Sequence, residues 1–181
     1  MNVLALCGSL RQQSRSLALL QAIRALAPGS MDVTLFAGLG DLPLFNPDLE
    51  PCAPKPVQAL WDAVAQADAL VIASPEYAHG VTGTIKNALD WLVGLVPFTQ
   101  KPVAVLNPSH RAQHADDALR EILCTMNAQL IPEACLRIPV TACDLNAEAL
   151  ASDPTLSTLI RSALAALDAF HANGLPRPGE S

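Results

Sequence analysis

The sequence is poor in charge and has no long apolar run. Only 15% of its 181 residues are charged, whereas 51% are hydrophobic. This composition excludes an intrinsically disordered chain, which requires low hydrophobicity and high charge. No apolar stretch approaches the roughly 20 residues that a membrane-spanning helix needs. We therefore expect a large buried core and no membrane partner.

A basic cluster is also lacking. The chain has 11 Lys and Arg residues against 17 Asp and Glu residues, which gives a net charge of −6. Nucleic-acid-binding domains carry a concentrated basic surface, so we expect no nucleic acid partner. An anionic ligand must instead be attracted by a few local arginines against an unfavourable overall field.

Cysteine pairs with redox or metal-binding spacing are missing. The five cysteines form an odd set without a C-x-x-C motif, and Met1–Cys7 lacks the charged leader of an export signal. We expect free thiols in a reducing cytosol and a cytoplasmic protein. The cysteines are Cys7, Cys52, Cys124, Cys135 and Cys143.

Several catalytic and binding motifs are absent. There is no G-x-G-x-x-G, no G-x-x-x-x-G-K-[ST] and no G-x-S-x-G, so a dinucleotide fingerprint, a Walker loop and an α/β-hydrolase elbow are not indicated. The histidines share no metal-ligand spacing with cysteines or carboxylates, so we expect no zinc site. They are His79, His110, His114 and His171.

Apolar strand-like runs alternate with helical patterns along the chain. This alternation predicts a parallel sheet covered on both faces, and right-handed crossovers favour the strand order 2-1-3-4-5. Residues 1–174 are expected to form a single domain, followed by a flexible tail over 175–181. The predicted strands are Asn2–Leu6, Met31–Phe36, Ala69–Ala73, Val103–Asn107 and a fifth strand, Gln129–Ile131 and Ala134–Ile138, interrupted by Pro132.

The connections differ in character. Gly38–Pro56 is a long proline-rich connection, which is either functional or a stiffened surface segment. Asp144–Asp153 is polar and predicts a loop, and Thr155–Ala172 predicts the last helix. Asp116 and Asp117 are expected in the solvated first turn of a helix, where acidic groups favour the helix dipole.

The loop after the first predicted strand suits a phosphate monoester. Gly8 permits a tight turn, and the following helix offers free backbone N–H groups and a positive dipole end. Without the dinucleotide and Walker motifs, a mononucleotide is the natural ligand. Alternatively, a serine here only caps the helix and the arginines are solvated. The loop supplies hydroxyls and guanidinium groups from Ser9, Ser14, Ser16, Arg11 and Arg15.

The loop Ser74–Gly80 follows the third predicted strand. Loops at the carboxyl ends of strands line the ligand crevice of an open α/β sheet. A rigid Pro75 and a permissive Gly80 allow the backbone to lie flat against a planar ring. The alternative is a strand-to-helix connection in which these two residues only turn the chain.

These two loops together resemble those of a known family. GSLRQQSRS after the first strand and SPEYAHGVTGTIKNALDW after the third are similar to motifs of the NADPH-dependent FMN reductase family, which includes quinone, chromate and azo-dye reductases. The resemblance covers about residues 2–140. It implies a flavodoxin-like α/β three-layer sandwich, with a five-stranded parallel sheet in the order 2-1-3-4-5 and helices on both faces.

The resemblance also implies cofactors, a reaction and site residues. Electrons would pass from NADPH or NADH through bound FMN to quinone, flavin or similar small acceptors, without a catalytic side chain or a metal. Ser9, Arg11, Ser14 and Ser16 would hold the FMN phosphate, Pro75, Glu76, Tyr77, Ala78 and Gly80 would line the isoalloxazine, and Ser109 and Arg111 would approach the flavin from the loop after the fourth strand.

The chain departs from the family pattern at three places. Ser16 and Ala78 stand where many members have Asn, and the loop Asn107–Ala112 lacks the glycines that are common there. Ala78 offers only backbone contacts. These departures motivate an alternative function, a flavin-binding electron carrier or regulatory protein of the same fold without efficient reductase activity.

The helix predicted after the second loop has a wide apolar surface. A surface helix needs one apolar stripe, so the second suggests contact with another subunit. We expect a homodimer or homotetramer with Trp91 or Leu95 in the interface. Alternatively, the same chain covers the second stripe. The stripes are Val81, Ile85, Leu89, Leu92 and Val96, and Ala88, Trp91 and Leu95.

Overall fold

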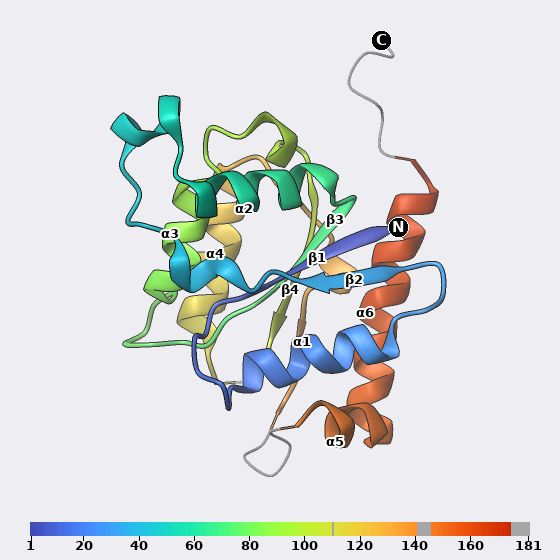
Figure 1. Ribbon diagram of the computed structural model, residues 1–181. Helices are drawn as coiled ribbons and strands as arrows, with labels where there is room; N and C mark the ends of the chain where they lie inside the picture. The colour runs from blue at the N-terminus through green and yellow to red at the C-terminus, as the bar shows by residue number, and fades with distance from the viewer. Residues whose placement is uncertain (110, 141–145, 175–181) are drawn as a thin grey trace.

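A parallel sheet runs through the centre of the protein (Figure 1). The computed structural model describes residues 1–109, 111–140 and 146–174, so the predicted tail over 175–181 lies outside the described residues. The strands are β1 (Asn2–Cys7), β2 (Asp32–Leu35), β3 (Ala69–Ala73), β4 (Pro102–Asn107), β5 (Gln129–Leu130) and β6 (Leu136–Arg137).

The strand order is β2-β1-β3-β4-β5, which confirms the predicted topology. In the centre, Leu4 pairs with Leu70 and Leu70 with Val103, all in parallel register. The fifth strand is interrupted near Pro132, as predicted. β5 and β6 each pair with β4, and the short 3₁₀ helix η4 (Pro132–Ala134) separates them.

Helices cover both faces of the sheet. One face carries α1 (Arg15–Leu26), α5 (Ala147–Ser152) and α6 (Pro154–Ala172), and the other carries α2 (Lys55–Gln66), α3 (Gly83–Asp90) and α4 (Gln113–Thr125). In Figure 1, α1, α5 and α6 lie together on one side and α2, α3 and α4 on the other. Among the described residues, no helix combines the length and apolar character needed to cross a bilayer.

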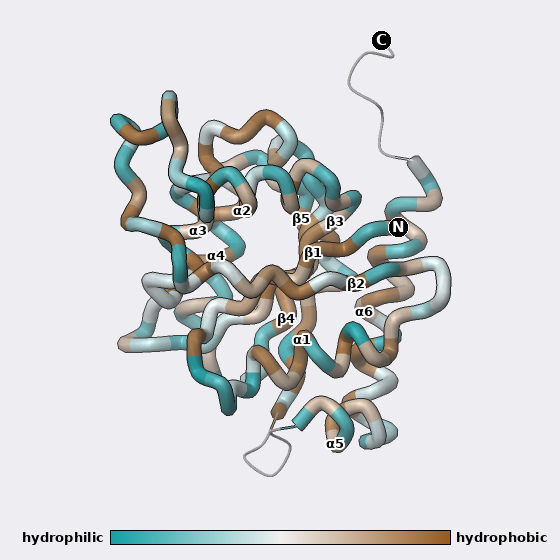
Figure 2. The backbone as a smooth tube through the Cα atoms, in the orientation of Figure 1, coloured by the Kyte–Doolittle hydropathy of each residue, from teal (hydrophilic) through white to brown (hydrophobic). Residues whose placement is uncertain are grey.

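Two hydrophobic clusters lie on opposite faces of the sheet. Successive side chains of a strand point to opposite faces of the sheet. Val3 and Ala5 of β1 therefore pack in the cluster beneath α1, α5 and α6, and Leu4 and Leu6 pack in the cluster beneath α2, α3 and α4. β3 is buried along its whole length. Figure 2 shows the hydrophobic colour concentrated along the central strands, as expected for a parallel sheet covered on both sides.

Two connecting segments contain helical turns that the sequence interpretation missed. The predicted loop over 144–153 contains α5, whose first turn is capped by Asn146 through its side-chain oxygen and the Ala149 N–H, 2.7 Å away. The 38–56 connection forms two 3₁₀ helices, η1 (Gly38–Asp41) and η2 (Pro47–Cys52).

The helix predicted over residues 81–96 is shorter than expected. α3 ends at Asp90, and a separate 3₁₀ helix, η3 (Val96–Phe98), follows. Pro97 disfavours α-helical conformation at the residue before it, so an α-helix does not run through Val96, which instead begins the 3₁₀ helix. Val96 is 80% exposed and therefore does not pack on the sheet.

The second apolar stripe is covered by the chain itself. Ala88 and Trp91 are fully buried, so Trp91 does not lie in a subunit interface. Leu95, the other predicted interface residue, is half-buried, and its place in an interface stays a prediction. The Trp91 ring packs edge-on against Phe45 at 5.0 Å and Trp61 at 6.5 Å, and its Nε1 donates to the Pro43 carbonyl at 2.9 Å. The 38–52 segment therefore folds back over α3.

Asp116 is buried rather than solvated, contrary to the sequence interpretation. Its Oδ2 accepts from Arg120 Nε at 3.2 Å and from Arg137 Nε at 3.1 Å, which joins α4 to β6. Asp117 is 71% exposed, and its Oδ1 forms an ion pair with Arg137 Nη2 at 3.4 Å. Since a buried carboxylate is costly unless paired, these two guanidinium groups offset the cost of burying Asp116.

We expect Asp116→Ala to lower the free energy of unfolding by about 3 kcal/mol, because it leaves two partly buried guanidinium groups without their carboxylate. Urea titration followed by far-UV circular dichroism measures this change. Asp90→Ala is the matched control, because Asp90 forms only a surface pair with Lys86 one helical turn away. It should cost no more than about 0.5 kcal/mol, and equal losses in both variants would contradict the assignment.

Candidate functional site

An open cleft of about 510 Å³ lies at the carboxyl ends of β1, β3 and β4. This volume falls within the range of small-molecule sites. Nine of the eleven predicted site residues line the cleft, and Ala78 and Gly80 do not. The lining residues are Ser9, Arg11, Gln13, Ser14, Arg15, Ser16, Pro75, Glu76, Tyr77, Asn107, Pro108, Ser109, Arg111 and Ala112.

The first two loops meet at Gly8. The Gly8 N–H donates to the Ala73 carbonyl at 2.8 Å, which continues the pairing of β1 with β3 into the loops. A Cβ at position 8 would lie 2.1 Å from Ser74 Oγ and 2.5 Å from Ser74 Cβ. Only glycine allows this close approach, so Gly8 fixes the spacing of the two cleft loops.

Thr82 reinforces this junction. Its hydroxyl donates to the Gly8 carbonyl at 2.7 Å, accepts from the Ile85 N–H at 3.3 Å and lies 3.4 Å from Ser74 Oγ. Thr82 therefore caps the N-terminus of α3 and at the same time fastens the first loop to the second.

The first turn of α1 forms one end of the cleft. Ser14 caps the helix by accepting from the Leu17 N–H at 3.4 Å, and Ser9 Oγ accepts from the Arg11 N–H at 3.4 Å. Ser16 is 1% exposed, yet its hydroxyl finds no hydrogen-bond partner within the part of the chain that the structure describes. Buried hydroxyls are normally partnered. An anionic oxygen bound at this helix N-terminus would supply the missing partner, so the residues fit a phosphate.

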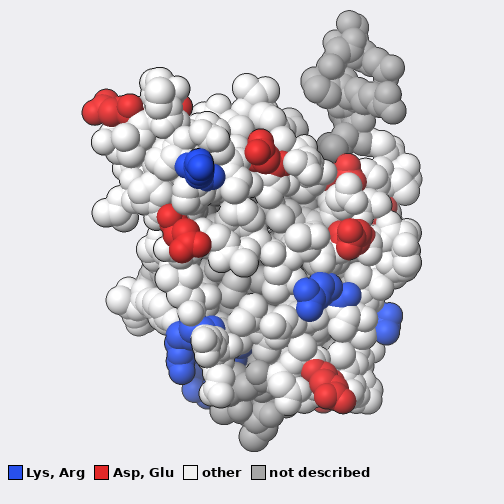
Figure 3. All heavy atoms as spheres, viewed as in Figure 1, with Lys and Arg blue, Asp and Glu red and all other residues white. Residues whose placement is uncertain are grey.

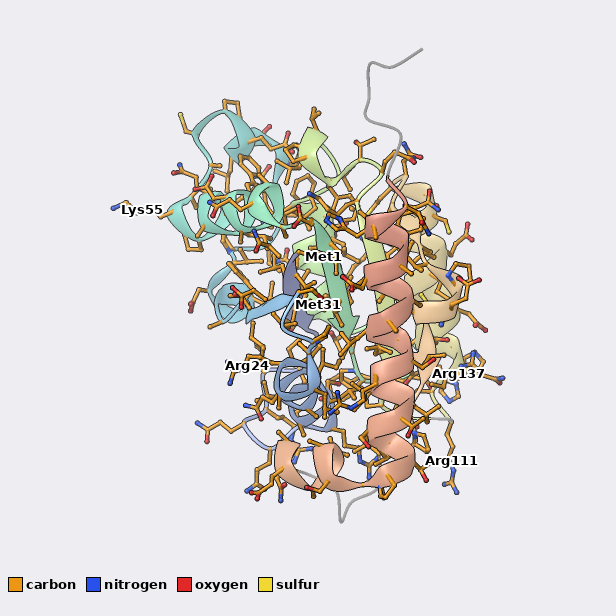
Figure 4. The ribbon with its side chains drawn as sticks, turned by 90° about the vertical axis from the view of Figure 1, so that its right-hand side faces the viewer. Met1, Arg24, Met31, Lys55, Arg111 and Arg137 are labelled. Carbon is orange, nitrogen blue, oxygen red and sulfur yellow. The ribbon has the colours of Figure 1, made fainter. Side chains whose placement is uncertain are left out.

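Three arginines surround the cleft. Arg11, Arg15 and Arg111 line it, and all three are exposed. Figure 3 shows basic side chains gathered where the loop after β1 lies, on a surface that otherwise carries scattered charges of both signs. Figure 4 shows Arg111 projecting from the lower end of the molecule, far from Lys55 at the start of α2. The cleft therefore attracts anions locally, despite the net charge of −6.

Glu76 ties the second loop to α4. Its Oε2 accepts from the Ala115 N–H at 2.8 Å, in the first turn of α4. The N-cap residue of that helix, Ala112, has no side-chain oxygen to make this contact. Glu76 thus supplies a capping acceptor from a distant segment, where the helix dipole favours a carboxylate.

A tight turn projects from the second loop. Tyr77 and Gly80 exchange two backbone hydrogen bonds, of 3.1 and 3.0 Å, and the residues between them, Ala78 and His79, have φ angles of 49° and 59°. Two central residues with positive φ define a type I′ turn, which favours Asn and Gly. The turn leaves Tyr77 53% exposed at the cleft.

Gly80 has ordinary backbone geometry, and its predicted place beside the flavin ring stays a prediction. Its φ is not positive, and a Cβ built there would meet only the Tyr77 carbonyl oxygen, at 3.8 Å, an ordinary contact distance. The chain itself therefore leaves room for a side chain at this position. The backbone strain of the loop lies at Ala78 and His79 instead.

Asn107 organises the third loop, which lacks glycine. Its Oδ1 accepts from the Ser109 N–H at 3.0 Å, and its Nδ2 donates to the Ala112 carbonyl at 2.7 Å. Ser109 Oγ in turn accepts from the Arg111 N–H at 3.1 Å. Asn107 is 4% exposed, so both ends of the loop are anchored to a rigid buried amide.

The thiol nearest to the cleft is a poor nucleophile. Burial raises the pKa of Cys7 above its usual value, and its Sγ–H donates to the Ser9 carbonyl at 3.4 Å. Because the thiolate is the reactive form, a protonated Cys7 has a packing role.

Some lining residues escaped the sequence interpretation: Gln13, Asn107, Pro108 and Ala112. The sequence carried a signal for Asn107, because Asn followed by Pro at a strand end is typical of a side-chain-stabilised turn. Gln13 and Ala112 carry no such signal. They reach the cleft only because of how their loops fold.

The strand order, with an open cleft at the carboxyl ends of β1, β3 and β4, is that of a flavodoxin-like protein. Comparison with known sequences is more specific. The profile of the NADPH-dependent FMN reductase family matches residues 1–141, and the chain belongs to this family. It is accordingly an NAD(P)H-dependent oxidoreductase that uses FMN.

Individual relatives agree with this assignment. A quinone reductase of Escherichia coli K12 is 36% identical over 141 residues, which cover 72% of this chain and 73% of that protein. A 2-hydroxy-1,4-benzoquinone reductase of a Burkholderia species is 30% identical over 161 residues, covering 84% and 87%. The solved structure of FerB, a flavoenzyme NAD(P)H:(acceptor) oxidoreductase of Paracoccus denitrificans, superimposes with a TM-score of 0.77 at 30% identity, covering 96% of this chain and 99% of that protein.

We expect Gly8→Ala to destabilise the protein by about 1–3 kcal/mol and to weaken flavin binding, because the new methyl group forces the first two loops apart. Adding Ser74→Gly removes the two nearest clashing atoms and should restore about 1 kcal/mol or more. Urea unfolding of the single and double variants measures this coupling.

Gly29→Ala is the control, because a Cβ at that position meets nothing within 4 Å. It should leave both stability and flavin content unchanged. If Ser74→Gly did not relieve the effect of Gly8→Ala, close approach at this junction would not be the cause.

Proposed function

We propose that this chain is a cytoplasmic FMN-dependent reductase that passes electrons from NADPH or NADH to quinones and similar small acceptors. The observation that carries the proposal is the cleft itself, in which the unpartnered hydroxyl of Ser16 lies at a helix N-terminus beside three arginines. The relatives named as quinone reductases support the choice of acceptor.

When bound, FMN would supply the redox chemistry between the nicotinamide and the acceptor. The chain's own residues would bind FMN and orient it. Ser9, Ser14, Ser16 and the first turn of α1 hold the phosphate, with Arg11 adding a charge-assisted contact. Pro75, Glu76 and Tyr77 form a rigid wall beside the ring, because Glu76 is fixed to α4.

The open side of the cleft suits two successive substrates. A small acceptor can replace the nicotinamide only if the same face remains accessible, and the exposed Tyr77 and Arg111 form an accessible rim. Arg111 attracts the anionic parts of the nicotinamide nucleotide electrostatically. No side chain is required as an essential general acid or base.

We expect Arg11→Ala to lower FMN affinity by one to two orders of magnitude, since a charge-assisted contact contributes about 1.5–3 kcal/mol. Riboflavin, which lacks the phosphate, should bind the variant and the wild type about equally. Fluorescence quenching on flavin addition to the apoprotein measures both affinities. Arg24→Ala is the matched control, because Arg24 lies in the last turn of α1, at the far end of the helix.

Ser16→Ala separates binding from folding in the same titration. Its buried hydroxyl has no partner among the described residues, so its removal should not destabilise the apoprotein. FMN affinity should nevertheless fall. Unchanged FMN affinity in both Arg11→Ala and Ser16→Ala would contradict this phosphate site.

The protein is also proposed to be a homodimer or homotetramer. An exposed apolar rim is defined by Leu44 and Leu49 of the 38–52 segment and by Val93 and Val96 of the stretch that follows α3. The two parts of the rim are neighbours, because a Cβ on Gly94 would lie 3.6 Å from Glu50 Oε1. A contiguous apolar surface on an otherwise polar protein favours contact with a second chain.

We expect Val96→Glu to weaken self-association by about two orders of magnitude, because it places an unpaired charge in an apolar contact. Sedimentation velocity across a concentration series measures the effect. Ala165→Glu adds the same charge at an exposed position of α6, on the opposite face, and should leave assembly unchanged. A wild-type monomer that holds stoichiometric FMN at micromolar concentration would overturn the proposal.

A further inference from the structure

Two histidines from distant segments meet beside the cleft. His79 lies in the tight turn of the second loop and His114 in the first turn of α4, and their ring centroids are 4.5 Å apart with an interplanar angle of 56°. Both side chains are exposed. Neither imidazole makes a hydrogen bond to another side chain or backbone group within the described part of the chain, so ring nitrogens remain available for a ligand.

The pair is held in place by the surrounding backbone. Glu76 fixes the second loop to the Ala115 N–H at 2.8 Å, immediately next to His114. On the other side, the turn holds His79 at a φ of 59°, a conformation that non-glycine residues rarely adopt. Backbone strain of this kind is typical of ligand-binding positions.

The separation of the rings indicates which ligand fits. With a metal–nitrogen bond of about 2.0–2.1 Å, an imidazole centroid lies about 3.2 Å from a bound ion. Two centroids 4.5 Å apart then subtend an angle of about 90° at that ion. Tetrahedral zinc would require centroids about 5.2 Å apart. Neighbouring positions of a tetragonal ion require a right angle, which the 4.5 Å separation gives when one nitrogen of each ring binds the same ion.

We propose that His79 and His114 form a site for a tetragonal divalent transition-metal ion, copper or nickel, at the rim of the flavin cleft. Imidazole suits both metals, and Cu²⁺ lies at the maximum of the divalent affinity series. Among the described residues, no group of three or more His, Cys, Asp or Glu side chains is placed to hold an ion. Water therefore completes the coordination, and the bound ion links the second loop to α4.

Equilibrium dialysis of the tag-free holoprotein against Ni²⁺ tests the site. Nickel is the primary probe because the exposed thiols of Cys52 and Cys124 react with Cu²⁺. We expect one strongly bound Ni²⁺ per chain, and at least a tenfold weaker affinity in His79→Asn and in His114→Gln. Asn preserves the left-handed backbone conformation at position 79, so the turn is retained.

His171→Gln is the matched control, because His171 is an exposed histidine in the last turn of α6. It should bind Ni²⁺ like the wild type. Ni²⁺ should also raise the melting temperature of the wild type and of His171→Gln, but not that of the other two variants. Flavin absorbance on the same samples verifies that every variant remains folded.

Three results would overturn the proposal. They are no stoichiometric Ni²⁺ binding by the wild type, undiminished binding by His79→Asn or His114→Gln, and tighter binding of Zn²⁺ than of Ni²⁺. The first two would make the histidine pair a simple ring contact. The third would contradict the right-angle geometry.

Discussion

The close approach of Gly8 to Ser74 is the constraint on which the site depends. The loop after β1 forms the end of the cleft where we propose that the phosphate binds, and the loop after β3 forms the wall where we propose that the ring lies. Their separation is set where a Cβ at position 8 would lie 2.1 Å from Ser74 Oγ, and Thr82 locks the junction by bonding to the Gly8 carbonyl. The lack of a Cβ at Gly8 thus sets the spacing of two loops that lie more than sixty residues apart in the sequence.

Side chains fix the other two cleft loops, where a local helix cap or a glycine would be more usual. Glu76 caps α4 from the second loop because Ala112 cannot, and Asn107 braces a third loop that has no glycine. These contacts hold the second and third loops in place at the cleft. The ion pairs of Asp116 with Arg120 and Arg137 hold α4 against β6. The capped end of α4 is therefore a stable support for the second loop.

Much of the fold was predictable, because buried parallel strands are short apolar runs and the helices between them are amphipathic. The strand order and the break at Pro132 followed from those patterns. The sequence did not indicate that the 38–52 segment covers Trp91, or that Asp116 is paired with Arg137, since both are long-range contacts without a local signature. The backbone conformation of the second loop had no local signature either. A glycine in a loop indicates freedom, but the backbone placed the positive φ angles at Ala78 and His79.

The central claim is that this cleft holds FMN in a position where a nicotinamide can reduce it, and anaerobic mixing of the purified protein with NADPH tests it most directly. We expect a yellow protein whose flavin absorbance bleaches on addition of NADPH or NADH and returns when a quinone is added. Flavin that remains oxidised with both nicotinamides would contradict reductase function and favour an electron carrier. A colourless protein that does not bind added FMN would contradict the flavin site itself.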